Sequence, residues 1–112
     1  MGRLFITGAS GFVGFHIAQT FIQQGWEVTA LVRESSSVTP LQEIGVSLHR
    51  GDLLAAPTFQ QAMEGADVVV HCAGLTKALS YQEFRTVNAQ GAGQVARAAS
   101  IVGVPRLILI SS

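Results

Sequence analysis

Charged residues and cysteine are scarce in this chain of 112 residues, and the charges that are present cancel. Charged residues make up 12% of the chain, and 7 basic residues balance 7 acidic ones to a formal net charge of +0. This balance provides no basic surface for nucleic acid, so we expect no nucleic-acid partner. The single cysteine, Cys72, excludes an internal disulfide. Cysteine and histidine are also too few and too scattered for a structural zinc site, and we expect no metal.

Long apolar runs are absent as well. No stretch approaches the ~18 residues that a membrane helix needs, and no basic-then-apolar leader precedes Arg3. We therefore expect no membrane partner and a cytoplasmic location. Hydrophobic residues nevertheless make up 48% of the chain, which predicts one compact domain over residues 1–112 with a sizeable core.

The most informative stretch runs from Arg3 to Gly14 and joins an apolar run to three glycines. Residues 4–6 predict a buried strand, and apolar residues at helical spacing follow the glycines. A strand, a glycine turn and a helix in this order form the context that a phosphate-binding loop requires. The spacing is Gly-x-x-Gly-x-x-Gly, and the alternative interpretation is a tight strand-to-helix turn that binds no ligand.

Each glycine of this stretch has a separate physical reason. Gly8 lets the chain leave the strand in a backbone conformation that a side chain penalises. Gly11 keeps the backbone bare where a pyrophosphate comes close, and Gly14 lets the helix pack tightly against the sheet. The helix N-terminus offers N–H groups and a partial positive charge to the phosphates, and the hydroxyls of Thr7 and Ser10 add further contacts.

Strand and helix patterns alternate along the whole chain. Strands are expected at residues 4–6, 27–32, 46–50, 67–72 and 106–110, and helices at residues 12–24, 39–45, 57–64 and 80–102. This alternation predicts an α/β fold with a doubly wound parallel sheet, strand order 3-2-1-4-5 and helices on both faces. A ligand crevice is expected between the first and fourth strands, beyond their carboxyl ends.

Local signals mark the ends of the expected helices. Thr39 is expected to cap the second helix, with Pro40 at its first helical position. Ser80 and Glu83 form a capping box that opens the long last helix. Glycines close the four helices, at positions 25, 45, 65 and 103.

Five motifs in order make the chain resemble the N-terminal part of an extended short-chain dehydrogenase/reductase, a group also called the NAD-dependent epimerase/dehydratase family. They are the glycine motif of residues 7–14, Gly51-Asp52-Leu53, His71-Cys-Ala-Gly74, Val87-Asn-Ala-Gln-Gly91 and Ser111-Ser112. The resemblance implies a Rossmann fold with a dinucleotide cofactor, and it adds Phe12 and Val13 to the cofactor-binding residues. It covers all 112 residues, but only part of such an enzyme.

The same resemblance assigns roles to residues near the strand ends. Asp52 is expected to accept a hydrogen bond from the adenine amino group, with Leu53 against the ring. Ala73 and Gly74 let the cofactor lie on the backbone, and Asn88 helps to shape the nicotinamide end of the site. The alternatives are a loop-capping carboxylate at Asp52, an ordinary turn after the fourth strand, and a solvated or locally bonded asparagine.

Ser112 resembles the family's catalytic serine, which holds the reacting oxygen of the substrate, and Ser111 is the second candidate. A polar strand end is the alternative for both. The family's proton-transfer pair is a tyrosine followed four residues later by a lysine. Here Arg85 stands four residues after the only tyrosine, Tyr81, which we interpret as structural. Whether this chain is an enzyme by itself is left open.

Arg33 bears on the choice of cofactor. A dinucleotide fold that prefers NAD places an acidic residue about 20 positions beyond the glycines, and here 33 − 14 = 19 brings Arg33 to that place. Arginine suits the 2′-phosphate of NADP, and the serines at positions 35–37 add hydroxyls. Glu34 argues for NAD if the register slips by one. We favour NADP over NAD, and the alternative for Arg33 is a solvated loop cation.

The remaining candidates have structural interpretations. His16 and His49 are expected at the surface, and His71 is expected to be a structural member of its motif. Cys72 is expected to be a small buried hydrophobe. The phenylalanine rings at positions 12, 15 and 21 are expected to pack rather than to form a stacking platform.

Two functions from different classes follow from these patterns. The first is the NAD(P)-binding part of an oxidoreductase, epimerase or dehydratase that acts by hydride transfer, with a small-molecule substrate such as a nucleotide sugar. The second is a non-catalytic NADP-binding redox-sensor module, and a Tyr-x-x-x-Lys beyond Ser112 would favour the enzyme over it. A structural domain without ligand is a third interpretation.

The fifth strand is apolar on both faces, which is typical of the interior of a parallel sheet. In this chain it is expected to lie at an edge, with unpaired N–H and C=O groups. We therefore expect the chain to be a fragment, truncated after this strand, and the exposed edge to self-pair, swap or aggregate.

Overall fold

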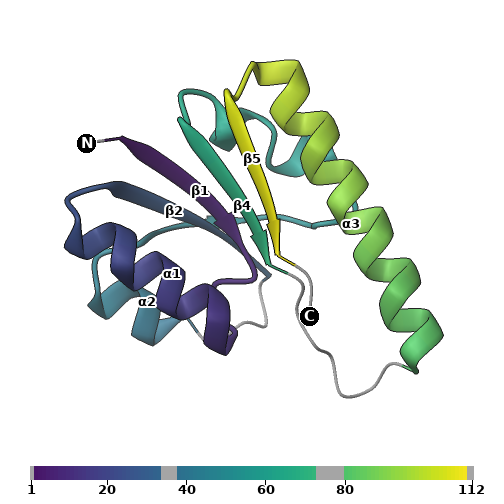
Figure 1. Cartoon of the computed structure of the whole chain (residues 1–112), viewed down its shortest axis with the longest axis horizontal. Coiled ribbons are helices and arrows are strands. Elements are labelled where there is room, and N and C mark those ends of the chain that lie inside the picture. Colours follow the sequence, from purple (N-terminus) through teal and green to yellow (C-terminus); the bar gives the residue numbers. More distant parts are fainter. Residues whose placement is uncertain (1, 34–37, 73–79, 111–112) are drawn as a thin grey trace.

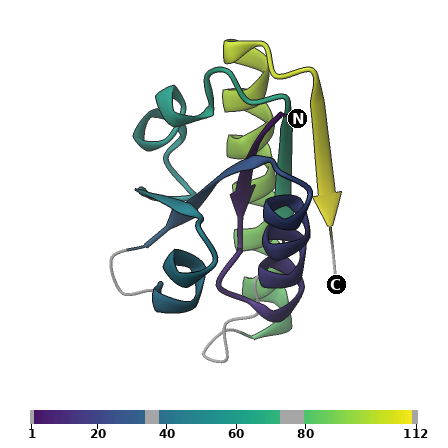
Figure 2. The ribbon, with the colours of Figure 1, turned by 90° about the vertical axis from the view of Figure 1, so that its left-hand side faces the viewer.

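A computed structural model describes residues 2–33, 38–72 and 80–110, which form a five-stranded parallel sheet in the order β3-β2-β1-β4-β5. The strands are β1 (Arg3–Thr7), β2 (Glu27–Val32), β3 (Ser47–Arg50), β4 (Val68–Cys72) and β5 (Arg106–Ile110). Helices α1 (Phe12–Gln23) and α2 (Thr39–Glu43) cover one face, and α3 (Tyr81–Val102) covers the other, as Figure 1 and Figure 2 show. The predicted doubly wound sheet and its strand order are confirmed.

The side chains of the sheet alternate between two apolar cores, as the pleat of a strand requires. Leu4 and Ile6 of β1 pack toward Ala18 of α1. Phe5 points to the opposite face, where it packs with Val95 of α3 and stacks on Phe59 at a ring-centroid distance of 6.2 Å. Both faces of the central strands are therefore buried, which explains why these strands are apolar throughout.

Two local predictions were wrong. Residues 57–64 were expected to form one helix, but they form two short 3₁₀ turns, Ala56–Thr58 and Gln61–Met63. Tertiary contacts favour the turns, because Phe59 and Met63 are fully buried and Gln94 of α3 accepts a hydrogen bond from the Ala56 N–H at 2.9 Å.

The second wrong prediction concerns the start of α2. Thr39 does not cap this helix, because the chain enters it one residue earlier: Val38 occupies the N-cap position and makes no side-chain hydrogen bond. The capping role of Ser80 is confirmed, since its hydroxyl accepts a hydrogen bond from the Glu83 N–H at 3.2 Å.

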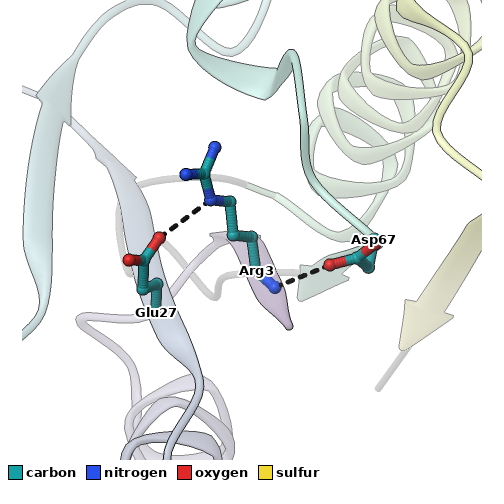
Figure 3. Close-up of polar contacts among 3 residues, drawn as sticks. All are labelled: Arg3, Glu27 and Asp67. Atoms are coloured by element: carbon teal, nitrogen blue, oxygen red, sulfur yellow. Dashed lines mark hydrogen bonds and ion pairs between the residues drawn. The ribbon is translucent and has the colours of Figure 1, made fainter. Parts of the chain in front are cut away.

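The amino end of the sheet is held by polar contacts of Arg3. Its backbone N–H donates to Asp67 Oδ2 at 2.9 Å, and its Nε lies 2.8 Å from Glu27 Oε2 (Figure 3). The side chains of Arg3 and Glu27 are 62% and 75% exposed, so this ion pair contributes at most about 1 kcal/mol. The Asp67 contact joins the beginnings of β1 and β4. The glycine turn lies at the opposite, carboxyl end of these strands.

The glycine turn after β1 is packed against neighbouring backbone. Gly8 has a φ of +74°, and a Cβ there would lie 2.4 Å from the carbonyl oxygen of Cys72 at the end of β4. A Cβ on Gly14 in the first turn of α1 would lie 2.1 Å from the Gly8 carbonyl oxygen. Only glycine fits either place, and this fit brings the turn, α1 and β4 together.

A polar pair continues the α3 face of β1 and β4 at the carboxyl end of the sheet. Thr7 and His71 are paired in the sheet register and are each only 2% exposed. The Thr7 hydroxyl and Nδ1 of His71 are hydrogen-bonded at 2.5 Å. Burial lowers the pKa of His71 below its ordinary 6.5, and the nearby Asn88 side chain partly offsets this by raising it. The fold thus favours the neutral form of the His71 ring.

We predict that Gly14→Ala lowers the free energy of unfolding by at least about 3 kcal/mol, the upper end of the usual cost of overpacking. The reason is that the added Cβ would collide with backbone atoms, which cannot adopt another rotamer as a side chain can. Gly93→Ala is the matched control, since both glycines lie in helices and a Cβ on Gly93 meets nothing within 4 Å. The control should raise stability by about 0.5–1 kcal/mol. Urea denaturation measures both variants, and equal effects would contradict the close approach at Gly14.

We predict that stability falls as the pH drops below about 6.5. The folded-state pKa of His71 is lowered, so between that value and 6.5 the unfolded chain binds a proton that the folded chain does not. The loss should begin near 6.5 and end below the folded-state pKa. Chemical denaturation from pH 7.5 to 5 should show this slope in the natural chain and in a His16→Asn control, whose histidine is exposed. The slope should flatten in His71→Asn, and an unchanged slope there contradicts the assignment.

Candidate functional site

The candidate site lies at the carboxyl end of the sheet, where the chain changes from one face to the other. Strand β1 pairs with β2 on one side and with β4 on the other, and all these strands run parallel. The connection from β1 uses the face of α1, whereas the connection from β4 uses the face of α3 (Figure 1). Where the helices that follow two neighbouring strands lie on opposite faces of a parallel sheet, ligands bind in the crevice between the carboxyl ends of those strands.

The N-terminus of α1 faces this crevice without a capping side chain. Gly11 is the N-cap residue and makes no side-chain hydrogen bond, and no acidic residue lies in the first turn. The first N–H groups of the helix therefore lack both an intrahelical partner and a capping oxygen. Phe12 and Val13 are 80% and 52% exposed beside them. This arrangement offers donors and a partial positive charge to an anion.

The two hydroxyls expected near the phosphates lie in different surroundings. Ser10 is exposed in the glycine turn, as the expected role requires. The Thr7 hydroxyl instead lies in the buried pair with His71. The structure thus places Ser10 on the open side of the turn and Thr7 beneath it.

A pocket of about 250 Å³ lies between the glycine turn, α1 and α2. The His16 ring meets the Phe12 ring edge-on at a centroid distance of 4.5 Å. His16 is exposed, as expected, and it also lines this pocket. The sequence contains no signal for this, because the pocket depends on how α2 packs beside α1. Its lining residues are Ser10, Gly11, Phe12, Phe15, His16, Pro40 and Leu41.

Asp52 and Leu53 follow β3 at the same edge of the sheet. Asp52 Oδ1 accepts from the Leu54 N–H at 2.9 Å, so one carboxylate oxygen holds the loop. The other oxygen of a carboxylate can still accept a bond from a ligand, and the two interpretations of Asp52 are compatible. Leu53 packs on Gly91 of α3, where an added Cβ would lie 2.8 Å from Leu53 Cδ2. Leu53 is therefore also part of the contact between this loop and α3.

Arg33 directly follows β2 and is exposed at the same edge as the glycine turn. Its carbonyl oxygen accepts a hydrogen bond from Arg50 Nη1 at 3.1 Å, which ties the end of β2 to the end of β3. The competing candidate, Glu34, and the serines at 35–37 lie outside the described residues.

The nicotinamide side of the expected site is described in part. Asn88 is half-buried on α3, close to His71. Cys72 and Ile110, the last residues of β4 and β5, are paired in register, so these two strands end side by side. The candidates that follow them in sequence, Ala73, Gly74, Ser111 and Ser112, lie outside the described residues.

Sequence reasoning missed two polar contacts between elements that are distant in the sequence. Neither the Thr7–His71 pair nor the bond between Gln94 and the Ala56 N–H was expected. The sequence did contain a signal for a partner of His71. Strand β4 is otherwise made of three valines and the weakly polar Cys72, so His71 is its one strongly polar residue. A buried polar group in such a strand requires a partner.

In the part of the chain that the structure describes, no group of three or more His, Cys, Asp or Glu residues is arranged to hold a metal ion. No described helix has the length and apolar character to cross a membrane.

Comparisons with known proteins agree with this fold. The family model for the NAD dependent epimerase/dehydratase family matches residues 4–112. A ceramide reductase of Caulobacter vibrioides is 38% identical over 111 residues, which are 99% of this chain and 35% of that protein. The crystal structure of gox2253 has a TM-score of 0.88 and 28% identity, covering 100% of this chain and 34% of that one. WbmG of Bordetella bronchiseptica, solved in complex with NAD, has a TM-score of 0.81 and 28% identity, covering 96% and 36%.

The chain thus spans about a third of the length of the relatives that it matches. The match begins at the first core residue of β1 and includes the glycine turn, the crevice and β5. The Rossmann fold and the resemblance inferred from the five motifs are confirmed. This chain belongs to the NAD dependent epimerase/dehydratase family.

Proposed function

We propose that this chain is the NADP-binding part of an oxidoreductase, epimerase or dehydratase of this family. The observation that carries the proposal is the uncapped N-terminus of α1, preceded by a close-packed glycine turn at the crevice between β1 and β4. These features fit a pyrophosphate, which needs backbone N–H donors and space for close approach. The WbmG structure, which contains NAD, supports the same class of cofactor.

The residues of this chain would divide the binding as follows. The turn of Gly8, Gly11 and Gly14 holds the pyrophosphate, Ser10 adds a hydroxyl, and Asp52 accepts a hydrogen bond from the adenine amino group. A bound nicotinamide dinucleotide supplies the hydride chemistry. Among the residues at the ends of β4 and β5, Ser112, or Ser111 in its place, orients the reacting oxygen of the substrate.

NADP is favoured over NAD because of Arg33. The end of β2 carries an exposed guanidinium at the edge of the sheet that also carries the glycine turn. A guanidinium binds a phosphate through several parallel N–H donors, whereas a ribose 2′-hydroxyl is best held by a carboxylate.

The substrate and the reaction are proposed only by class, because the chain spans about a third of the length of its relatives. One relative is named a ceramide reductase, and this name supports a carbonyl or alcohol substrate for the proposed activity. The non-catalytic redox-sensor module is distinguished by the sequence beyond Ser112, where a Tyr-x-x-x-Lys pair supports the enzyme. A cytoplasmic location stays a prediction.

We further propose that the chain by itself associates through β5. This strand lies at the edge of the sheet, and its Ile108 and Leu109 are 40% and 55% exposed. An apolar edge strand with unpaired backbone groups is a template for pairing with another chain.

The cofactor is tested by calorimetric titration of the chain with NADPH and, separately, with NADH at one salt concentration. We expect saturable NADPH binding and weaker NADH binding. Arg33→Ala should weaken NADPH binding about tenfold or more, the effect of losing a charged hydrogen bond, and leave NADH binding unchanged. Arg97→Ala, an exposed arginine on α3, is the control. Equal or tighter NADH binding by the natural chain would shift the assignment to Glu34 and NAD.

Association through β5 is tested by sedimentation at increasing concentration. The natural chain should form dimers or larger species, and Leu109→Lys should keep it monomeric by placing a charge on the edge strand. Ile101→Lys is the control, because Ile101 is 56% exposed but lies on α3. A monodisperse monomer at high concentration would argue against the proposal.

A further inference from the structure

The two ring nitrogens of His71 have unequal surroundings. Nδ1 is hydrogen-bonded to the Thr7 hydroxyl at 2.5 Å. Nε2 is buried, and no hydrogen bond of regular geometry reaches it from the part of the chain that the structure describes. A buried nitrogen without a partner is costly, so a polar side chain beside the ring is significant.

Asn88 of α3 supplies such a side chain. Its side chain is close enough to the imidazole to raise the pKa of His71 against the larger effect of burial. Asparagine in the middle of a helix is unfavourable unless its amide has a use elsewhere. Its amide contains both a donor and an acceptor, so it can serve Nε2 in either neutral form of the ring.

We infer that His71 is a positioning residue, whose imidazole joins the Thr7 hydroxyl on one side to the Asn88 amide on the other. Thr7 immediately precedes Gly8, so this link connects the glycine turn to α3 through the buried end of β4. Its effect on cofactor binding rests on the function proposed above, whereas the link itself does not.

The packing of α3 explains why such a link is useful. Among the described side chains and glycines of this helix, the first buried position is Gly91, and the apolar contacts with the sheet follow at Val95, Ala98 and Ala99. The described positions before Gly91 are exposed or half-buried. Asn88 therefore lies one turn before the part of α3 that packs on the sheet, and a hydrogen bond there ties this part of the helix to the end of β4.

If this link exists, removing the Thr7 hydroxyl should change the surroundings of the Asn88 amide through the His71 ring. Nuclear magnetic resonance of labelled protein should show that Thr7→Val shifts the side-chain amide resonances of Asn88 and both ring nitrogen resonances of His71. Thr7→Ser keeps the hydroxyl and should restore the natural values. Thr20→Val is the matched control, because Thr20 is exposed on α1 and its hydroxyl bonds only locally, to the His16 carbonyl.

Two outcomes of this measurement overturn the inference. The first is an Asn88 amide that is unchanged in Thr7→Val. The second is a nitrogen shift for Nε2 in the natural chain that does not respond to Asn88→Ala. Neither readout requires a cofactor, and both use variants that leave the apolar cores unchanged.

NADPH titration tests the effect on the proposed site. Thr7→Val and Asn88→Ala should each weaken binding by roughly threefold to tenfold, the effect of one hydrogen bond. The double variant should lose little more than the single ones, because both break the same link. Fully additive losses contradict a shared link. If the natural chain fails to bind NADPH, the proposed function is lost, while the resonance shifts still decide the role of His71.

Discussion

The close approach of Gly8 to the end of β4 is the constraint on which the rest of the site depends. A Cβ at Gly8 would lie 2.4 Å from the Cys72 carbonyl oxygen, and a Cβ at Gly14 would lie 2.1 Å from the Gly8 carbonyl oxygen. These two contacts bring the start of α1 over the crevice between β1 and β4. The N-terminus of α1, which has no side-chain cap, is held in this position by the close packing of Gly8 and Gly14.

Around the glycine turn, some side chains are exposed where a ligand could bind and others are buried and support the fold. On the outer side of the turn, Ser10, Phe12 and Val13 are exposed around the uncapped helix. Beneath it, Thr7 and His71 form a buried pair that faces α3. The exposed residues and the buried pair are thus close in sequence, because Thr7 is the last residue of β1 and the glycine turn begins directly after it.

The chain spans about a third of the length of the relatives that it matches. It contains the glycine turn and the crevice on which the proposed cofactor site rests. Under the proposed function these features bind and orient the cofactor, and a hydride transfer also needs a proton-transfer pair, which residues 1–112 do not contain in the family's Tyr-x-x-x-Lys form. β5 has apolar side chains at the edge of the sheet, although its composition is typical of an interior strand.

The sequence by itself determined the elements whose signals are local. The strand at 27–32, the Ser80 cap and the glycine turn follow from β-branched residues, a hydroxyl before a helix, and glycines where a Cβ would collide. Periodicity then determined the sheet order through the known rules of crossover connections. The local elements depend on neighbours within a few residues of one another, and the sheet order follows from how these elements alternate along the chain.

Only the tertiary structure decided the features that depend on distant neighbours. The segment at 57–64 forms 3₁₀ turns because of its contacts with α3. Gln94 accepts a hydrogen bond from the Ala56 N–H, and Phe59 and Met63 pack in the apolar core beneath this helix. The Thr7 hydroxyl is directed to His71, 64 residues away, rather than to the open turn. Leu53 packs on Gly91 for the same reason. Such partners are separated by whole elements, so their contacts exist only once the sheet has assembled.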